Sequence, residues 1–159
     1  MIGVGIALLS GLVATALLLP GGFDAAGVSL AGVGVLTWGV SGRAETRVLA
    51  GSALLFVAIL LGGLRELAPG LLLGATVTAV VAWDAATYVV DSRAQLDARA
   101  EIRRAALAHT GATLAATTAI TAVVYVAFLF GGSVSPLAAL LVLLGAVLVA
   151  MGLAPHSGD

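Results

Sequence analysis

The sequence contains no cysteine, lysine or asparagine. Without cysteine there can be no disulfide, no thiolate metal site and no cysteine nucleophile. The two histidines, His109 and His156, are too far apart in the sequence to show the spacing of a metal-binding pair. The formal net charge of −1 is unlike that of a nucleic-acid-binding domain, which needs a basic face. We therefore expect no cofactor, no metal and no nucleic-acid partner.

Recognisable enzyme motifs are also missing. No glycine-rich phosphate loop ends in lysine, no serine lies in a nucleophile elbow, and no HExxH helix occurs. Two acids close together in the apolar part of the chain, as an intramembrane aspartyl protease requires, are absent too. The sequence therefore predicts a protein that is not an enzyme.

Charge is scarce while apolar residues are abundant. Only 9% of the 159 residues are charged, against about 25% in an ordinary soluble domain. Hydrophobic residues make up 61%, and the mean hydropathy is +1.18. A soluble fold of this size has too little interior to hide so much apolar surface. We therefore expect a multi-pass protein of the cell membrane, surrounded by lipid.

Six apolar stretches, separated by short polar or Gly/Pro breaks, predict the architecture. They are residues 2–19, 25–40, 48–64, 71–90, 107–130 and 136–153. Crossing a hydrocarbon layer of about 30 Å takes roughly 17–25 residues, so the second stretch is slightly short and its full crossing stays open. Because a spanning backbone must satisfy its own hydrogen bonds, each stretch should be a helix. The prediction is an all-α, polytopic membrane helix bundle of about six transmembrane helices, forming a single membrane domain over residues 1–159. Small residues four apart, such as Gly27 and Ala31, suit close packing between these helices.

The arginines indicate the orientation of this bundle. Arg43 and Arg47 lie between the second and third stretches, and four more lie between the fourth and fifth. Only Arg65 falls on the opposite side. The positive-inside rule then places both termini in the cytoplasm.

Asp84 is the strongest single signal for function. It lies six residues before the end of the fourth stretch, on the order of 10 Å inside the boundary. An acid deep in a span costs about 2.5–3.5 kcal/mol to insert, so it normally faces the bundle interior and has a partner. Two interpretations remain open. Asp84 is either part of an ion- or proton-linked site, or an acid hydrogen-bonded for packing or reaching the cytoplasmic boundary.

The fifth stretch offers partners for Asp84. A polar stripe recurs every four residues, at His109, Thr113, Thr117, Thr121 and Tyr125. The stripe is typical of a helix–helix contact, and a polar pathway is the alternative. Because histidine changes charge near neutral pH, an Asp84–His109 pair is a candidate proton switch, although His109 could simply rest at the interface. Asp84, Tyr88, His109 and Thr113 form the candidate polar site.

The segment 91–106 carries seven of the fifteen formal charges of the chain. It contains no glycine or proline and is rich in alanine, which predicts a cytoplasmic helical segment. It is either a docking surface for a partner or a solvated loop whose arginines fix the topology and contact lipid headgroups. The candidate docking residues are Arg93, Asp97, Arg99, Glu101, Arg103 and Arg104.

A resemblance to a known family lies within residues 82–111. It is carried by Ala82-Trp83-Asp84, by the charged run from Gln95 to Arg104, and by Ala108-His109-Thr110-Gly111. This part resembles a haloarchaeal family of small multi-pass membrane proteins of unknown function. The usual pattern of that family is Trp-Asp, a Gly-Glu-Gln-Leu-Gly-like segment and a later Arg-Ala-Glu-Leu-Val-His. The present chain lacks the glycines after Asp91, and Ala106-Leu107 replaces Leu-Val before His109.

The resemblance implies partners rather than an activity. Genes of that family tend to neighbour those of MoxR-type AAA ATPases and of membrane proteins with von Willebrand factor A domains. Asp84, Arg104 and His109 occupy matching motif positions. Together with the composition, this favours a non-enzymatic scaffold or subunit of a membrane assembly. Its expected partners are the lipid bilayer, other membrane proteins or further copies of the chain, and a cytoplasmic ATPase. The alternative is a small transporter or an ion- or proton-conducting subunit that uses Asp84.

Overall fold

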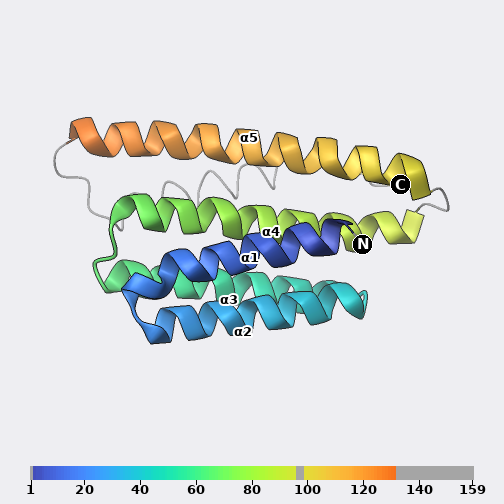
Figure 1. Cartoon of the computed structure of the whole chain (residues 1–159), viewed down its shortest axis with the longest axis horizontal. Helices are drawn as coiled ribbons and strands as arrows, with labels where there is room; N and C mark the ends of the chain where they lie inside the picture. Colours follow the sequence, from blue (N-terminus) through green and yellow to red (C-terminus); the bar gives the residue numbers. More distant parts are fainter. Residues whose placement is uncertain (1, 96–98, 132–159) are drawn as a thin grey trace.

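The computed structural model describes the backbone of residues 2–95 and 99–131, and the side chains of residues 3–91, 107–126 and 129. These residues form five α-helices and one 3-10 turn, and the described part contains no strand (Figure 1). The helices are α1 (Ile2–Leu18), α2 (Phe23–Ser41), α3 (Glu45–Leu64), α4 (Pro69–Gln95) and α5 (Arg99–Gly131), with the turn η1 (Leu19–Gly21) after α1.

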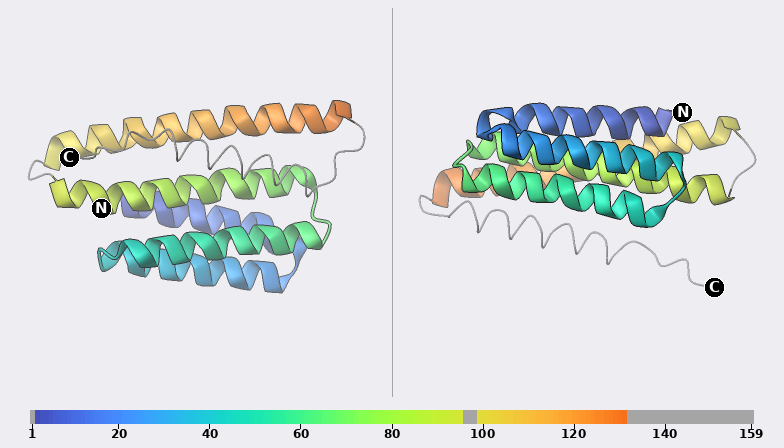
Figure 2. Two further views of the ribbon diagram at one scale, coloured as in Figure 1. Left: turned by 180° about the vertical axis from the view of Figure 1, so that it is seen from behind. Right: turned by 90° about the horizontal axis from the view of Figure 1, so that it is seen from below.

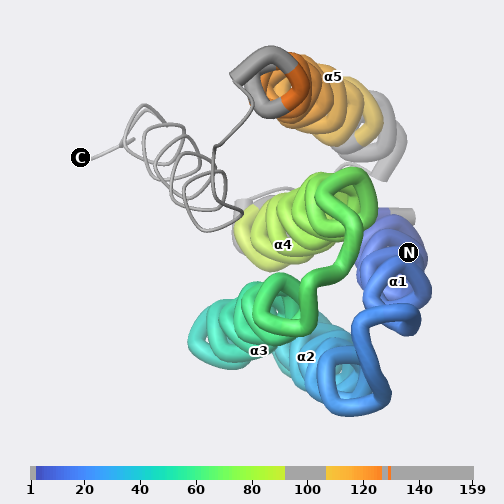
Figure 3. The backbone as a smooth tube through the Cα atoms, turned by 90° about the vertical axis from the view of Figure 1, so that its left-hand side faces the viewer, coloured from blue at the N-terminus to red at the C-terminus, as the bar shows by residue number. Residues whose placement is uncertain are grey.

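The helices run up and down, and α4 lies at the centre of the described bundle. It packs against each of the other four helices, whereas α5 packs mainly against α4. The end-on view in Figure 3 shows α4 between α5 on one side and α1 and α3 on the other. Its inner face carries a stripe of fully buried alanines at Ala75, Ala79, Ala82 and Ala86. Because alanine is small, helix axes can approach α4 closely along this stripe.

Five of the described helices are long and apolar enough to cross a membrane by length and composition. They correspond to the first five predicted stretches. The second stretch, which is slightly short by hydropathy, belongs to a helix of 19 residues, Phe23–Ser41. Its ends carry polar residues such as Asp24 and Ser41, which interfacial water and headgroups can solvate. The predicted sixth span, residues 136–153, lies outside the described residues.

The helices α4 and α5 continue beyond their apolar parts. In the sequence the apolar stretch of α4 ends at Val90, but the helix reaches Gln95; α5 begins at Arg99, whereas the apolar stretch within it begins at Leu107. The helical prediction for the charged segment is therefore confirmed for residues 91–95 and 99–106, and residues 96–98 lie outside the described part. Figures 1 and 2 show both helices extending past the neighbouring ends of α1, α2 and α3.

Glycines bring α2 and α3 into close contact. A Cβ atom added to Gly32 would lie 2.9 Å from the carbonyl oxygen of Gly51, and one added to Gly39 would lie 2.7 Å from the backbone nitrogen of Val48. The predicted packing pair, Gly27 and Ala31, is instead exposed, and a Cβ at Gly27 would meet nothing within 4 Å. Spacing alone does not identify the packed residues, because the rotation of α2 decides which of its small residues face α3.

Candidate functional site

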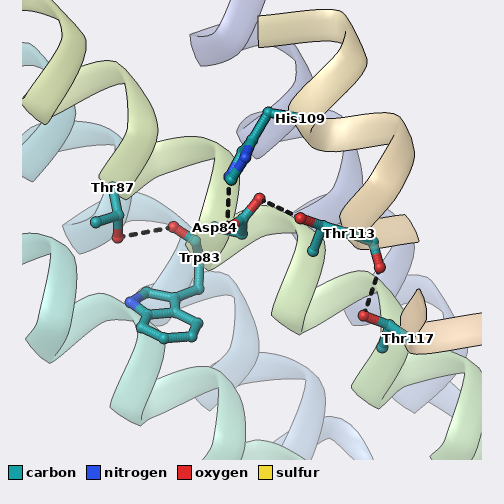
Figure 4. A network of polar contacts seen from close by, with 6 residues as sticks. All are labelled: Trp83, Asp84, Thr87, His109, Thr113 and Thr117. Atoms are coloured by element: carbon teal, nitrogen blue, oxygen red, sulfur yellow. Dashed lines mark hydrogen bonds and ion pairs between the residues drawn. The ribbon is translucent and has the colours of Figure 1, made fainter. Parts of the chain in front are cut away.

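Asp84 lies at the contact between α4 and α5, and both of its carboxylate oxygens have a partner there. The imidazole Nε2 of His109 lies 3.1 Å from Oδ1, and the hydroxyl of Thr113 donates to Oδ2 at 2.9 Å (Figure 4). The side chain of Asp84 is 23% exposed and that of His109 is 46% exposed. The predicted contact between Asp84 and His109 is therefore present, and the acid is not left alone on the outer surface.

The spacing of the sequence explains why these groups meet. His109 and Thr113 are four residues apart, so they lie one above the other on the same face of α5 and can reach one carboxylate. On α4, Tyr88 follows Asp84 by one helical turn and stacks on His109, with ring centroids 4.9 Å apart and an interplanar angle of 21°. The structure thus brings together all four residues of the candidate polar site.

This geometry suits two roles, one that involves a proton and one that joins two helices. With His109 neutral, its Nε2–H can donate to the carboxylate; with His109 protonated, the same contact is an ion pair, so the cluster can accommodate a proton. The same hydrogen bonds also join α5 to α4, since each crosses between the helices. The Tyr88 ring restricts the imidazole by stacking, which holds Nε2 toward Asp84.

Beyond Thr113, the polar stripe does not continue as a chain of hydroxyl groups. The hydroxyl of Thr117 donates to the backbone carbonyl of Thr113 at 2.7 Å, within its own helix. The hydroxyl oxygen of Thr121 is buried and has no hydrogen-bond partner in the described part of the chain. Tyr125 is exposed. The threonines of the stripe lie on the face of α5 that is least exposed, as a helix–helix contact requires.

The predicted docking residues can be placed by backbone alone. Arg93 lies on the extension of α4, and Asp97 lies outside the described residues. The extension of α5 carries Arg99, Glu101, Arg103 and Arg104. The described extensions of α4 and α5 lie at the same end of the bundle as the turn between α2 and α3, which holds Arg43 and is followed by Arg47 in α3.

Sequence reasoning missed three polar contacts between distant positions. The hydroxyls of Thr15 and Ser29 are buried and hydrogen-bonded at 2.8 Å between α1 and α2. Asp24 and Arg65 form an ion pair of 2.7 Å. The guanidinium of Arg47 lies over the Trp38 ring, with Cζ 4.1 Å from the ring centroid. Polar residues in apolar stretches signal that partners are needed, but the pairing depends on how the helices are arranged. Within the described residues, no group of three or more His, Asp or Glu side chains could hold a metal ion.

The five apolar helices define a helical protein compatible with integral membrane insertion. A family model described as "Family of unknown function (DUF7519)" matches residues 1–151. The chain belongs to this family, in agreement with the predicted membership of an uncharacterised family. No curated protein and no solved structure matches the chain in the corresponding comparisons.

Proposed function

We propose that the protein is a non-enzymatic subunit or scaffold of an assembly in the cell membrane. In this proposal it crosses the membrane six times, both termini lie in the cytoplasm, and the charged ends of α4 and α5 bind a partner. The observation that carries the proposal is the continuation of both helices beyond their apolar parts. A loop that only fixed the topology would have no need for ordered helix on both sides.

The length and the charge of these helix ends support docking. At a rise of 1.5 Å per residue, the extensions measure roughly 6 Å after Asp91 and 12 Å before Leu107. The segment mixes arginines with acids, and a mixed pattern of charges favours one orientation of a partner over others. The resemblance to haloarchaeal proteins favours a cytoplasmic ATPase of the MoxR type or another membrane protein as that partner.

The orientation can be tested by labelling single cysteines in this cysteine-free chain. Ser41 lies at the end of α2, and Ala68 lies in the turn before α4. Both residues are exposed, so each can be replaced by cysteine for labelling. We expect a membrane-impermeant maleimide to label Ala68→Cys in intact cells, and Ser41→Cys only after the membrane is opened. The reverse pattern would show that the bundle is inserted in the opposite orientation.

The docking role can be tested by removing charge from the extension of α5. In the variant R99Q/R103Q/R104Q, we expect recovery of co-purified partner in mild detergent to fall about tenfold, because exposed ion pairs contribute up to about 1 kcal/mol each. Quantitative mass spectrometry of the purified complexes measures this recovery. The matched control is Arg65→Gln, an arginine change at the opposite end. Equal losses in the two variants would contradict docking at the α4–α5 end.

The second candidate function is proton or ion translocation through Asp84. It is favoured by the imidazole and the hydroxyl that lie within 3.1 Å of the carboxylate. The two functions differ in what they expect of Asp84→Asn, which keeps the shape of the side chain but removes its charge. Translocation requires this change alone to abolish pH-dependent flux in proteoliposomes, whereas the docking proposal expects it to be tolerated.

A further inference from the structure

The turn between α2 and α3 carries two arginines and an exposed tryptophan at one end of the bundle. Arg43 lies in the turn, Arg47 lies in the first part of α3, and Trp38 lies one turn before the end of α2. Trp38 is 61% exposed. Tryptophan is enriched at the level of lipid headgroups, where its ring is partly apolar and partly wet. We therefore expect the turn to lie at the level of the headgroups.

Arg47 is held in a defined position in this turn. Its guanidinium stacks on the Trp38 ring at 4.1 Å. A Cβ added to Gly42 would lie 3.1 Å from Arg47 Nη1, so the arginine runs back over the turn in space left by that glycine. Stacking occupies the face of the guanidinium and leaves its N–H donors, which lie in the plane of the group, available for a phosphate.

Arg43 occupies a backbone position that normally favours glycine. The end of α2 is closed by hydrogen bonds from the Ala44 N–H to the Gly39 carbonyl and from the Arg43 N–H to the Val40 carbonyl, at 2.9 and 3.5 Å. This pattern places the residue after the cap in the left-handed conformation, where glycine is usual. Arg43 has φ of 52°. Glu66 has φ of 57° at the end of α3, so the conformation alone does not identify a ligand; here it belongs to a second exposed arginine in the turn, four residues before Arg47 in the sequence.

The charges around the turn sum to a net positive charge, which an anion can neutralise. Among the described side chains, those of residues 3–91, 107–126 and 129, the ion pairs join Arg65 to Asp24 and His109 to Asp84, and neither Arg43 nor Arg47 takes part in one. Glu45 lies between them in the sequence, so the turn keeps a net charge of one positive unit. Juxtamembrane arginines attract anionic headgroups by about 1 kcal/mol each.

We propose that Trp38, Arg43 and Arg47 form a binding site for the phosphate of an anionic lipid headgroup, in the leaflet at this end of the bundle. The stacked guanidinium of Arg47 binds the phosphate oxygens, Arg43 adds a second positive charge, and Trp38 holds Arg47 at the depth of the headgroups. The site is independent of the docking role of α4 and α5.

Quenching of Trp38 fluorescence by brominated lipids tests the site directly. In a Trp83→Phe background, Trp38 is the remaining tryptophan, because the chain has two. The protein is placed in nanodiscs of phosphatidylcholine with increasing fractions of brominated phosphatidylglycerol, or of brominated phosphatidylcholine. We expect the brominated phosphatidylglycerol to quench at lower mole fractions. The measured quantity is the ratio of the two binding constants, so that a change in the fluorescence of Trp38 itself cancels.

Two variants separate binding from folding. Arg43→Gly and Arg47→Gln are each expected to lower the ratio about fivefold. Since glycine suits a φ of 52°, Arg43→Gly should leave the fold intact. Arg65→Gln, at the other end of the bundle, should leave the ratio unchanged. Equal quenching by the two lipids, or a ratio that survives both changes in the turn, would overturn the proposal. Relief of quenching by equal concentrations of inorganic phosphate would overturn the assignment to lipid and indicate a site for free phosphate.

Discussion

Replacing Gly51 with alanine is expected to destabilise the bundle by about 3 kcal/mol, the upper part of the range for an overpacked core. The added Cβ would lie 2.7 Å from the Cα atom of Leu36, which belongs to the backbone of α2 and cannot rotate away. The helices α2 and α3 would have to separate along their whole contact. Denaturation of the protein in mild detergent, followed by circular dichroism, measures the change.

The control for this prediction is Gly34→Ala, a change of the same chemistry on α2. A Cβ at Gly34 would meet nothing within 4 Å, and the residue is exposed. Alanine also favours helix over glycine by up to about 1 kcal/mol in water. We expect the stability of Gly34→Ala to be unchanged or slightly raised. If both variants lose stability equally, glycine flexibility rather than close helix approach explains the effect.

Replacing Asp84 with leucine is expected to loosen α5 from α4 and to cost about 2 kcal/mol. The change removes the acceptor of two hydrogen bonds between the helices and leaves His109 and Thr113 without it. Measured hydrogen bonds between membrane helices average about 0.6 kcal/mol, and a buried group left without a partner costs about 1–3 kcal/mol. Asp84→Asn keeps an acceptor and should cost less than half as much. Hydrogen exchange of the α5 backbone measures the loosening.

Two threonine variants provide the matched comparison. Thr113→Val removes a hydroxyl that bonds across to Asp84, whereas Thr117→Val removes one that bonds to its own helix backbone. We expect faster exchange in α5 only for Thr113→Val. Equal exchange in the two variants would show that the Asp84 cluster does not hold α5 in place.

The contact of Asp84 with His109 could be predicted because it depends on how far each residue lies from the end of its apolar stretch. Both residues lie near the same end of neighbouring antiparallel helices, and an acid in an apolar stretch needs a partner. Tyr88 follows from the helical repeat, since it is one turn from Asp84. The first five apolar stretches could also be predicted from hydropathy: those of α1, α2 and α3 match the helices to within about three residues, whereas α4 and α5 continue beyond theirs.

Other features depend on the rotation of each helix about its axis and on which helix faces meet. The hydropathy of the sequence does not specify either. Gly34 and Gly39 both lie on α2, yet only Gly39 meets the backbone of α3. Each glycine is followed by a valine, and the difference between them arises from how α2 turns its face toward α3. Thr15 and Ser29 likewise pair across two helices, which requires knowing that those faces meet.

The unbroken backbone of α4 has a mechanical consequence. No turn or break separates Asp84 from Gln95, so a distance of roughly 16 Å is spanned by a single stiff rod. A force that tilts or twists the Gln95 end of α4 therefore acts on Asp84, because no flexible break lies between them. Strain applied at the charged end of α4 would thus change the distance between the Asp84 carboxylate and the His109 imidazole.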